Sequence, residues 1–132
     1  MWRKLGVLGG YSMDKNIESI LIAWLNANLP SGWSASADVP ENKPDKFVVV
    51  ERTGGGVTTV RIEQPEVIIS YYHKSDAVEC SKVALETDIK LRAEIIEQAN
   101  VSKVERMSLV RLDDLTIKFK RYQGYYSFVH LI

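Results

Sequence analysis

The sequence contains little of several residue types on which common protein functions depend. It has one cysteine, Cys80, which excludes an intramolecular disulfide and means that a cysteine-based metal site could form only between subunits. Its only histidines are His73 and His130, so candidates for a general base or a metal ligand are few. We therefore expect no enzyme active site and no metal centre in this chain.

Long apolar runs and an excess of charge of one sign are also absent. No apolar run approaches the roughly 20 residues that a membrane-spanning helix needs. The 17 Lys and Arg residues balance 17 Asp and Glu residues. The chain therefore lacks the net positive charge typical of proteins that bind the phosphate backbone of nucleic acids. We therefore expect a soluble protein that makes no membrane contact and does not recognise a nucleic-acid sequence.

The composition that remains is that of one ordinary globular domain. Apolar residues make up 45% of the 132 residues and charged residues 26%, and a chain of this length can bury a single core without crosslinks. The segment from Leu5 to Gly9 is too short and too rich in glycine for the core of a signal peptide. Met13 and Asp14 form a natural start for the helix that follows. We predict a leader or tag-like segment over residues 1–12 and a single α+β domain over residues 13–132.

Periodicity predicts the elements of this domain. Apolar residues recur at helical spacing from Asp14 until Pro30 ends the helix. A second and longer helix is predicted from an N-cap at Ser75–Asp76, with Glu79 as the partner in a capping box, to about Ala99. Strands are predicted at residues 33–39, 46–53, 58–63, 66–73, 103–112 and 121–132. This order favours an α+β fold in which an antiparallel or mixed sheet is flanked by a short N-terminal helix and one long helix.

The run Gly54–Gly56 is the most conspicuous local feature, and two interpretations compete for it. A phosphate-binding loop needs a following helix and usually a Lys beside a Ser or Thr. Residues 57–62 instead alternate and are rich in β-branched side chains, as in a strand. We therefore interpret the glycine run as the turn of a β-hairpin, with positive φ at Gly54 or Gly55, and Pro65 as the separator of the next two strands.

The isolated residues whose side chains could take part in catalysis are each better explained by a structural role. His73 is in phase with the apolar residues of a strand and is predicted to end that strand near the edge of the sheet. Asp113–Asp114 falls in a predicted turn, where Asp is favoured because its side chain can bond its own backbone. Cys80 falls on the apolar side of the second helix and suits a small buried residue.

Aromatic residues gather at Tyr71–Tyr72 and from Tyr122 to Phe128, close to Lys118 and Lys120. Such a group could stack on the bases of a single-stranded nucleic acid. The residues from 125 to 131, however, alternate as in a strand that is covered on both faces, and the chain carries no net charge. A role in the core or in a protein interface is therefore favoured.

The second helix carries two apolar stripes, Cys80, Ala84, Leu91, Ile95 on one side and Val78, Leu85, Ile89, Ile96 on another. Between them lie Asp88 and Arg92, which are spaced for an i,i+4 ion pair. Either the two stripes face different partners, the sheet and a neighbouring subunit, or the charged pair reaches out to solvent at the rim of the core. We favour the first alternative and predict a subunit interface at Asp88, Leu91, Arg92 and Ile95.

Several segments together resemble a known family. The segments "VPENKPDKFVVVERTGGG", "QPEVIISYYHKSDAVECSKVA" and "KRYQGYYSFVHLI" follow a first helix in this order. Over residues 13–132 the chain resembles the tail terminator family of long-tailed bacteriophages and prophages, and the related minor tail and head-tail joining proteins. The points that carry the resemblance are Pro44 with Phe47–Val50, Arg52–Gly55, Pro65, the start of the second helix, and Arg121–Gln123. The segment before Met13 and the basic stretch Lys118–Lys120 depart from the family's pattern.

The resemblance implies a structural virion protein without catalysis or cofactor. Its subunits would close into a homo-oligomeric ring, typically a hexamer, that stops growth of the tail tube and presents a surface to the head connector. Its partners would be copies of itself, the tail tube protein and the head connector proteins. It would act at the tail-neck junction of the virion after assembly in the host cytoplasm. By position, Arg52, Gly54 and Gly55 would shape a hairpin beside the lumen or ring face, and Arg121 and Tyr122 would open the last strand. A head-completion or other neck protein, or an unrelated small ligand-binding domain, are the alternatives.

Overall fold

A computed structural model describes residues 16–59, 61–98 and 100–131, with the backbone alone for residues 58 and 59. The predicted leader over residues 1–12 and the predicted helix start at Met13–Asp14 lie outside these residues. The elements, in chain order, are α1 (Ile17–Asn28), β1 (Ala35–Ser36), β2 (Lys46–Thr59), β3 (Ile62–His73), α2 (Ala77–Glu94), a 3₁₀ turn (Ile95–Glu97), β4 (Val101–Arg111) and β5 (Lys120–Leu131).

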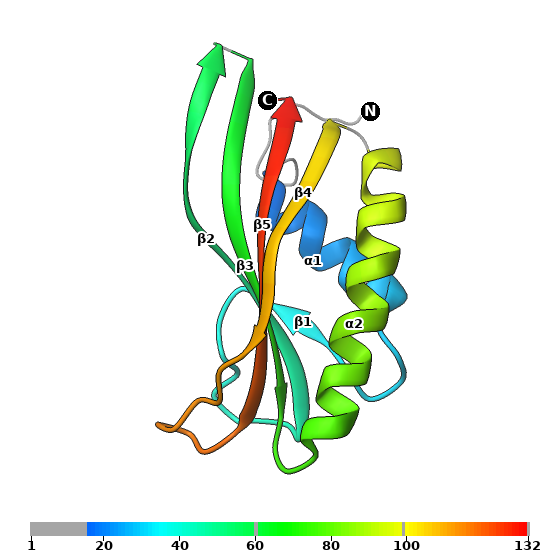
Figure 1. Ribbon diagram of the computed structural model, residues 1–132, viewed down its shortest axis with the longest axis vertical. Helices are drawn as coiled ribbons and strands as arrows, with labels where there is room; N and C mark the ends of the chain where they lie inside the picture. The colour runs from blue at the N-terminus through cyan, green and yellow to red at the C-terminus, as the bar shows by residue number, and fades with distance from the viewer. Residues whose placement is uncertain (1–15, 60, 99, 132) are drawn as a thin grey trace.

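The strands form one five-stranded sheet in the order β1-β2-β3-β5-β4. The short strand β1 runs parallel to β2, and the other neighbours are antiparallel, so the sheet is mixed. Figure 1 shows both helices on the same face of the sheet. The predicted fold class is confirmed: α+β, with a mixed sheet, a short N-terminal helix and one long helix.

The position of the first hairpin differs from the prediction. Strands β2 and β3 stay paired from Lys46 and His73 to Thr59 and Ile62, so their connection lies beyond Thr59. The glycine run lies inside β2, where Gly55 is paired with Pro65. The interpretation of the glycine run as the hairpin turn is therefore wrong, and so is the separation of two strands at Pro65.

The irregularity of the β2–β3 ladder explains why glycine and proline occur inside these strands. The register shifts between Arg52 and Gly54, and Gly55 has a φ of +113°, which confirms the predicted positive φ. A Cβ atom at Gly55 would lie 2.2 Å from the carbonyl oxygen of Gln64, so glycine is also needed for the close approach of two backbones. Pro65 lacks an N–H, and it lies where the pairing of β3 with β5 is interrupted between Glu63 and Glu66.

Both helices begin at side-chain caps. Asn16 accepts a hydrogen bond from the backbone N–H of Ser19 and begins α1, which ends before Pro30. Asp76 accepts from the backbone N–H groups of Val78 and Glu79 and begins α2. The amide of Asn26 in α1 donates to and accepts from the backbone of Ala35, which ties α1 to β1 at the edge of the sheet.

The main core lies between the helices and the sheet, and it contains Leu21 and Leu25 of α1, Leu91 of α2 and Tyr71 of β3. A smaller cluster lies on the opposite face of the sheet, where the segment between β4 and β5 brings Phe119 against Phe47, Val49 and Tyr72. The rings of Phe47 and Tyr72 are stacked with their centroids 4.6 Å apart. The rest of this second face carries no helix (Figure 1).

The segment between β4 and β5 confirms the turn predicted at Asp113–Asp114. The Asp114 carboxylate accepts hydrogen bonds from the backbone N–H groups of Thr116 and Ile117, at 3.0 and 3.4 Å. Asp114 also pairs with Phe119 through two backbone hydrogen bonds. The Asp114 carboxylate therefore shapes a tight connection.

Candidate functional site

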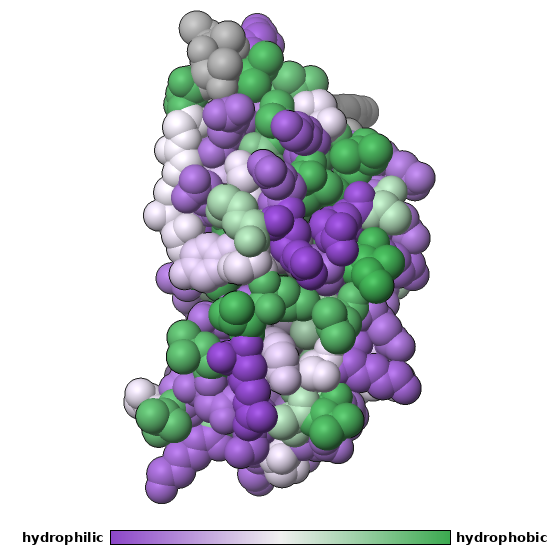
Figure 2. All heavy atoms as spheres, viewed as in Figure 1, coloured by the Kyte–Doolittle hydropathy of each residue, from purple (hydrophilic) through white to green (hydrophobic). Residues whose placement is uncertain are grey.

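Helix α2 has a covered apolar side and an open one. The first predicted stripe, Cys80, Ala84, Leu91, Ile95, is fully buried in the main core. The second stripe, Val78, Leu85, Ile89, Ile96, is between 49% and 78% exposed. Figure 2 shows apolar side chains along α2 and in a band that continues toward β4. Val78, Leu85 and Ile89 form the largest group of exposed large apolar side chains on one described element, and Ile96 in the 3₁₀ turn continues it. This open stripe is the candidate interaction surface.

Asp88 lies between the two stripes and is fully buried. Its carboxylate accepts a hydrogen bond of 2.6 Å from the hydroxyl of Tyr126 in β5. Arg92, one turn further along α2, binds both carboxylate oxygens at 2.9 to 3.2 Å, and Arg106 of β4 binds one of them at 3.0 Å. One buried carboxylate therefore ties α2 to two neighbouring strands.

The electrostatics of this network keep Asp88 charged. Burial by itself raises the pKa of Asp88, but the hydrogen bonds from Arg92 and Tyr126 and the charges of Arg92 and Arg106 outweigh burial and lower it below its usual value. Burial, together with Tyr71 and Asp88, raises the pKa of the Tyr126 hydroxyl, so this group stays protonated and donates to the carboxylate. The network thus satisfies a buried charge that would otherwise destabilise the fold.

Three of the four residues predicted to form a subunit interface are buried inside the subunit, so that prediction is wrong for them. Asp88, Leu91 and Ile95 are enclosed within the subunit and present no surface to a partner, because their side chains point into the core on the covered side of α2. Of the four predicted interface residues, only Arg92 reaches the surface, with its side chain 40% exposed. The expected division of α2 into two apolar stripes is present, but the stripe available to a partner is the second one.

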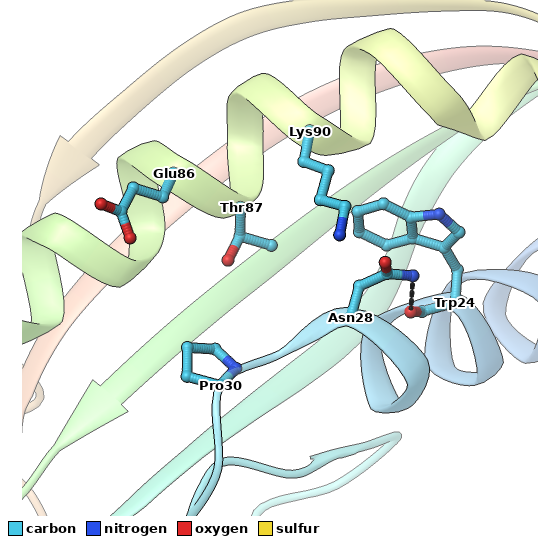
Figure 3. Close-up of a pocket in the computed structure, with 6 residues that line it drawn as sticks. All are labelled: Trp24, Asn28, Pro30, Glu86, Thr87 and Lys90. Carbon is cyan, nitrogen blue, oxygen red and sulfur yellow. Dashed lines mark hydrogen bonds between the residues drawn. The ribbon is translucent and has the colours of Figure 1, made fainter.

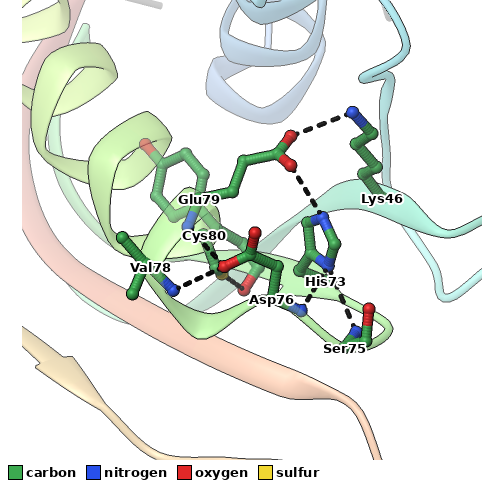
Figure 4. Close-up of polar contacts among 8 residues, drawn as sticks. Lys46, His73, Ser75, Asp76, Val78, Glu79 and Cys80 are labelled. Atoms are coloured by element: carbon green, nitrogen blue, oxygen red, sulfur yellow. Dashed lines mark hydrogen bonds and ion pairs between the residues drawn. The ribbon is translucent and has the colours of Figure 1, made fainter.

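A polar cluster joins the start of α2 to the sheet (Figure 4). The Nδ1 atom of His73 accepts hydrogen bonds from the backbone N–H groups of Ser75 and Asp76, so its proton lies on Nε2, which donates to Glu79. Lys46 binds the other oxygen of Glu79 at 2.9 Å. His73 therefore satisfies the N–H of Asp76 that Glu79 would reach in a capping box, which corrects that detail of the prediction. His73 ends β3, as predicted, and it has a structural role, but β3 is the central strand, so the predicted position near the edge of the sheet is wrong.

The environment of Cys80 does not suit a nucleophile. Its thiol is buried and donates to the backbone carbonyl oxygen of Tyr71 at 3.2 Å. Burial raises the pKa of the Cys80 thiol to about 12, so almost no thiolate forms at neutral pH. This confirms the expectation of a small buried residue.

A shallow pocket lies between the end of α1 and the middle of α2 (Figure 3). It is lined by Trp24, Asn28, Pro30, Glu86, Thr87, Lys90 and has a volume of about 180 Å³. Ligand sites usually measure about 300 to 1,000 Å³ and contain several converging polar groups. In Figure 3 the Asn28 amide is engaged by the backbone of Trp24, and Lys90 lies alongside the indole. This pocket is therefore a weak candidate for a ligand site.

The residues that the resemblance assigns to the ring face lie in the middle of β2, where Arg52 and Gly54 are linked. Arg52 binds the carboxylate of Glu63 with two hydrogen bonds of 3.2 Å and reaches the backbone oxygen of Gly54. Glu63 also accepts from His130. Burial raises the pKa of Glu63, but the hydrogen bonds from His130 and Arg52 outweigh burial and lower it. Arg52 therefore braces the irregular part of the β2–β3 ladder.

Arg121 and Tyr122 lie in the first three residues of β5, at the place that the resemblance gives them. Arg121 donates to the backbone oxygen of Leu112 at 2.7 Å and to Asp114 at 3.4 Å, and its guanidinium lies 5.7 Å from the centre of the Tyr72 ring. Tyr122 packs against the main core. Arg121 thus holds the β4–β5 connection against the sheet.

Sequence reasoning did not find the partners of these buried charges. Arg106 and Tyr126 are 18 and 38 residues from Asp88 in the chain, and His130 is 67 residues from Glu63. The alternation of residues 125–131 indicates that Tyr126 and His130 share a face of a strand, but it does not indicate what they meet. Only the pairing of the strands brings these groups together.

Among the described residues, no group of His, Cys, Asp and Glu side chains could hold a metal ion, and no helix is long and apolar enough to cross a membrane. Neither a scan of protein-family models nor a search of curated proteins finds a match to this chain. The candidate site therefore has to be judged on its own geometry, which is that of an exposed apolar surface on a well-packed subunit.

Proposed function

We propose that the protein is a structural virion subunit of a phage or prophage that acts as a tail terminator. Copies of the chain form a ring, of six subunits in the related family, on the completed tail tube. The ring stops polymerisation of the tube and joins it to the head connector. The protein has no enzymatic activity and no cofactor, and it acts at the tail-neck junction.

The single observation that carries an assembly role is the open apolar stripe of α2. Monomeric proteins rarely expose a continuous apolar surface, and larger exposed patches mark interaction sites. The fold does not need this stripe, because the opposite side of the same helix already fills the core. The assignment to phage tails in particular is supported by the ordered resemblance from "VPENKPDKFVVVERTGGG" to "KRYQGYYSFVHLI".

A head-completion or other neck protein of the same virion is the alternative, since it would use the same subunit with different neighbours. A small ligand-binding domain is less favoured, because the described pocket is small and its polar groups do not converge.

Deletion of the gene from the phage or prophage that encodes the chain would test the proposal. We expect electron micrographs to show tails of abnormal and variable length without attached heads, and the wild-type gene supplied from a plasmid should restore normal virions. Tails of normal length without heads would contradict a terminator and favour the neck alternative. Normal virions would exclude both.

A further inference from the structure

The open side of α2 is positively charged as well as apolar. One side of α2 is lined by residues that recur at alternating spacings of four and three, namely Val78, Lys82, Leu85, Ile89 and Arg92. Ile96, in the 3₁₀ turn that follows, continues this row, and we call the six residues the helix surface. Lys82 is exposed and makes no ion pair with another described residue. Arg92 and Arg106 share the single charge of Asp88, which leaves one positive charge uncompensated beside the stripe.

Part of the helix-free face of the sheet has the opposite character. Two neighbouring rows of paired residues cross it, Glu51-Ile68-Tyr125-Ser108 and Gly54-Glu66-Ser127-Glu105, which we call the open sheet face. Its three carboxylates are exposed and form no ion pair with another described residue. Neither row contains a basic residue. Tyr125, which is 37% exposed, supplies apolar surface between the carboxylates, whereas Ile68 beside it is buried.

We propose that the helix surface of one copy of this chain docks on the open sheet face of a second copy. The docked helix would cover the helix-free face of the next sheet, with Lys82 and Arg92 beside the carboxylates and Leu85 and Ile89 against the apolar surface around Tyr125. The partner is a second copy because the chain carries both complementary surfaces, on opposite sides of one sheet. Opposite charges fix which surfaces meet, and burial of the apolar stripe supplies the affinity.

The alternative, a symmetric dimer through two copies of the helix surface, is disfavoured by charge. A two-fold pairing of antiparallel helices centred between Leu85 and Ile89 would put Lys82 opposite Arg92 of the second copy. Like charges that face one another across an interface are repulsive and disfavour the pairing. Head-to-tail docking avoids this repulsion, and a repeated head-to-tail contact closes into a ring when the rotation per subunit divides a full turn.

This inference deepens the proposed function, since it names the contact through which the ring would form. Its test does not depend on phage tails. The full chain is studied by sedimentation velocity over a range of concentrations and salt. We expect wild-type association that strengthens with concentration and weakens as salt screens the charges. Lys82→Glu and Glu66→Lys should each weaken association at least ten-fold.

Mixing the two variants is the decisive measurement. In head-to-tail docking, the acidic helix surface of Lys82→Glu fits the basic sheet face of Glu66→Lys, and the two unchanged surfaces also fit, so an equimolar mixture should associate again. A symmetric helix dimer predicts the opposite, because Lys82→Glu alone would strengthen it and Glu66→Lys would have no effect. Lys90→Glu, the same charge change on another side of α2, is the matched control and should associate as wild type. Thermal unfolding should be unchanged for all three variants, since each side chain is exposed.

Three results would overturn the inference: a wild-type chain that stays monomeric at all concentrations, single variants that associate as wild type, or a mixture that stays dissociated. Association that appears only after removal of residues 1–12 would also contradict it, because the N-terminal segment would then be the occupant of one surface. Normal association of the variants together with over-long tails in the gene deletion would reject this interface and leave the proposed function standing.

Discussion

The two sides of α2 contain similar apolar residues in opposite environments. Leu91 is fully buried against the sheet, whereas Leu85, less than two turns away, is 49% exposed. Periodicity assigns both residues to apolar stripes but does not say which stripe the subunit itself covers. The difference shows that one stripe serves folding and that the other remains available for association.

Asp88 marks the boundary between the two sides. A buried carboxylate is costly unless its charge is compensated, and here Arg92, Arg106 and Tyr126 compensate it from three elements. This network fixes the rotation of α2 about its axis, because a turned helix would leave Asp88 without its partners. It thereby decides which stripe faces outward.

The largest effect is expected from matched leucine truncations on the two sides of α2. Leu91→Ala should lower the free energy of unfolding by about 3 kcal/mol, because it removes buried methyl groups and leaves a cavity. Leu85→Ala should change it by less than about 0.5 kcal/mol at low protein concentration, where the exposed side is unpartnered. Urea denaturation followed by circular dichroism would measure both values. Equal losses would mean that both sides are covered within the subunit.

Replacement of the charge at the boundary should have the next largest effect. Asp88→Asn keeps the shape but removes the charge that two arginines share, and we expect a loss of about 2 kcal/mol at pH 7. Because the pKa of Asp88 is lower in the folded than in the unfolded chain, its charge stabilises the fold at pH values above the usual carboxyl pKa of 3.8.

This stabilisation should be lost as the pH falls through the folded-state pKa. The difference in unfolding free energy between the wild type and Asp88→Asn should therefore shrink below about pH 4. Urea titrations at several pH values would measure it. A difference that stays constant with pH would show that the charge of Asp88 contributes nothing and that only its shape matters.

Gly55 and Gly54 of β2 differ in the same way as the two leucines, since one position is enclosed and the other is open. At Gly55 any side chain would clash with the backbone of Gln64 and Pro65 and would require a positive φ, so Gly55→Val should cost about 2 kcal/mol. A Cβ atom at Gly54 would meet no other atom within 4 Å, so Gly54→Val should be nearly neutral. Thermal unfolding of the two variants would rank them. Equal tolerance would contradict the close approach of β2 and β3 at this point.

The smallest effect is expected from removal of residues 1–12. The first capped helix begins after them, and they show no periodicity of a helix or strand. Thermal unfolding of the shortened chain should match that of the full chain within about 1 °C, since a loss of 1 kcal/mol would lower the melting temperature by several degrees. A larger loss would show that Trp2 or Leu5 packs on the core.

The sequence by itself determined the features that depend on neighbouring residues. The two helices, the cap at Asp76, the turn at Asp113–Asp114 and the division of α2 into two apolar stripes all follow from local spacing and local hydrogen bonding. The fold class followed from the order of these elements. Such features are readable because a helix or a turn is made by residues a few positions apart.

Only the tertiary structure decided where β2 ends, what Asp88 meets and which stripe of α2 stays open. Glycine occurs in turns and in irregular strands alike, so Gly54–Gly56 suggested a turn until the pairing of Gly55 with Pro65 placed it inside a strand. The sequence pattern assigned Asp88 to a subunit interface, which is wrong, because its partners Tyr126 and Arg106 come from strands that are distant in the chain. In each case the deciding contact joins residues far apart in the chain, and the free energy of such a contact depends on strand pairing and burial that no local pattern contains.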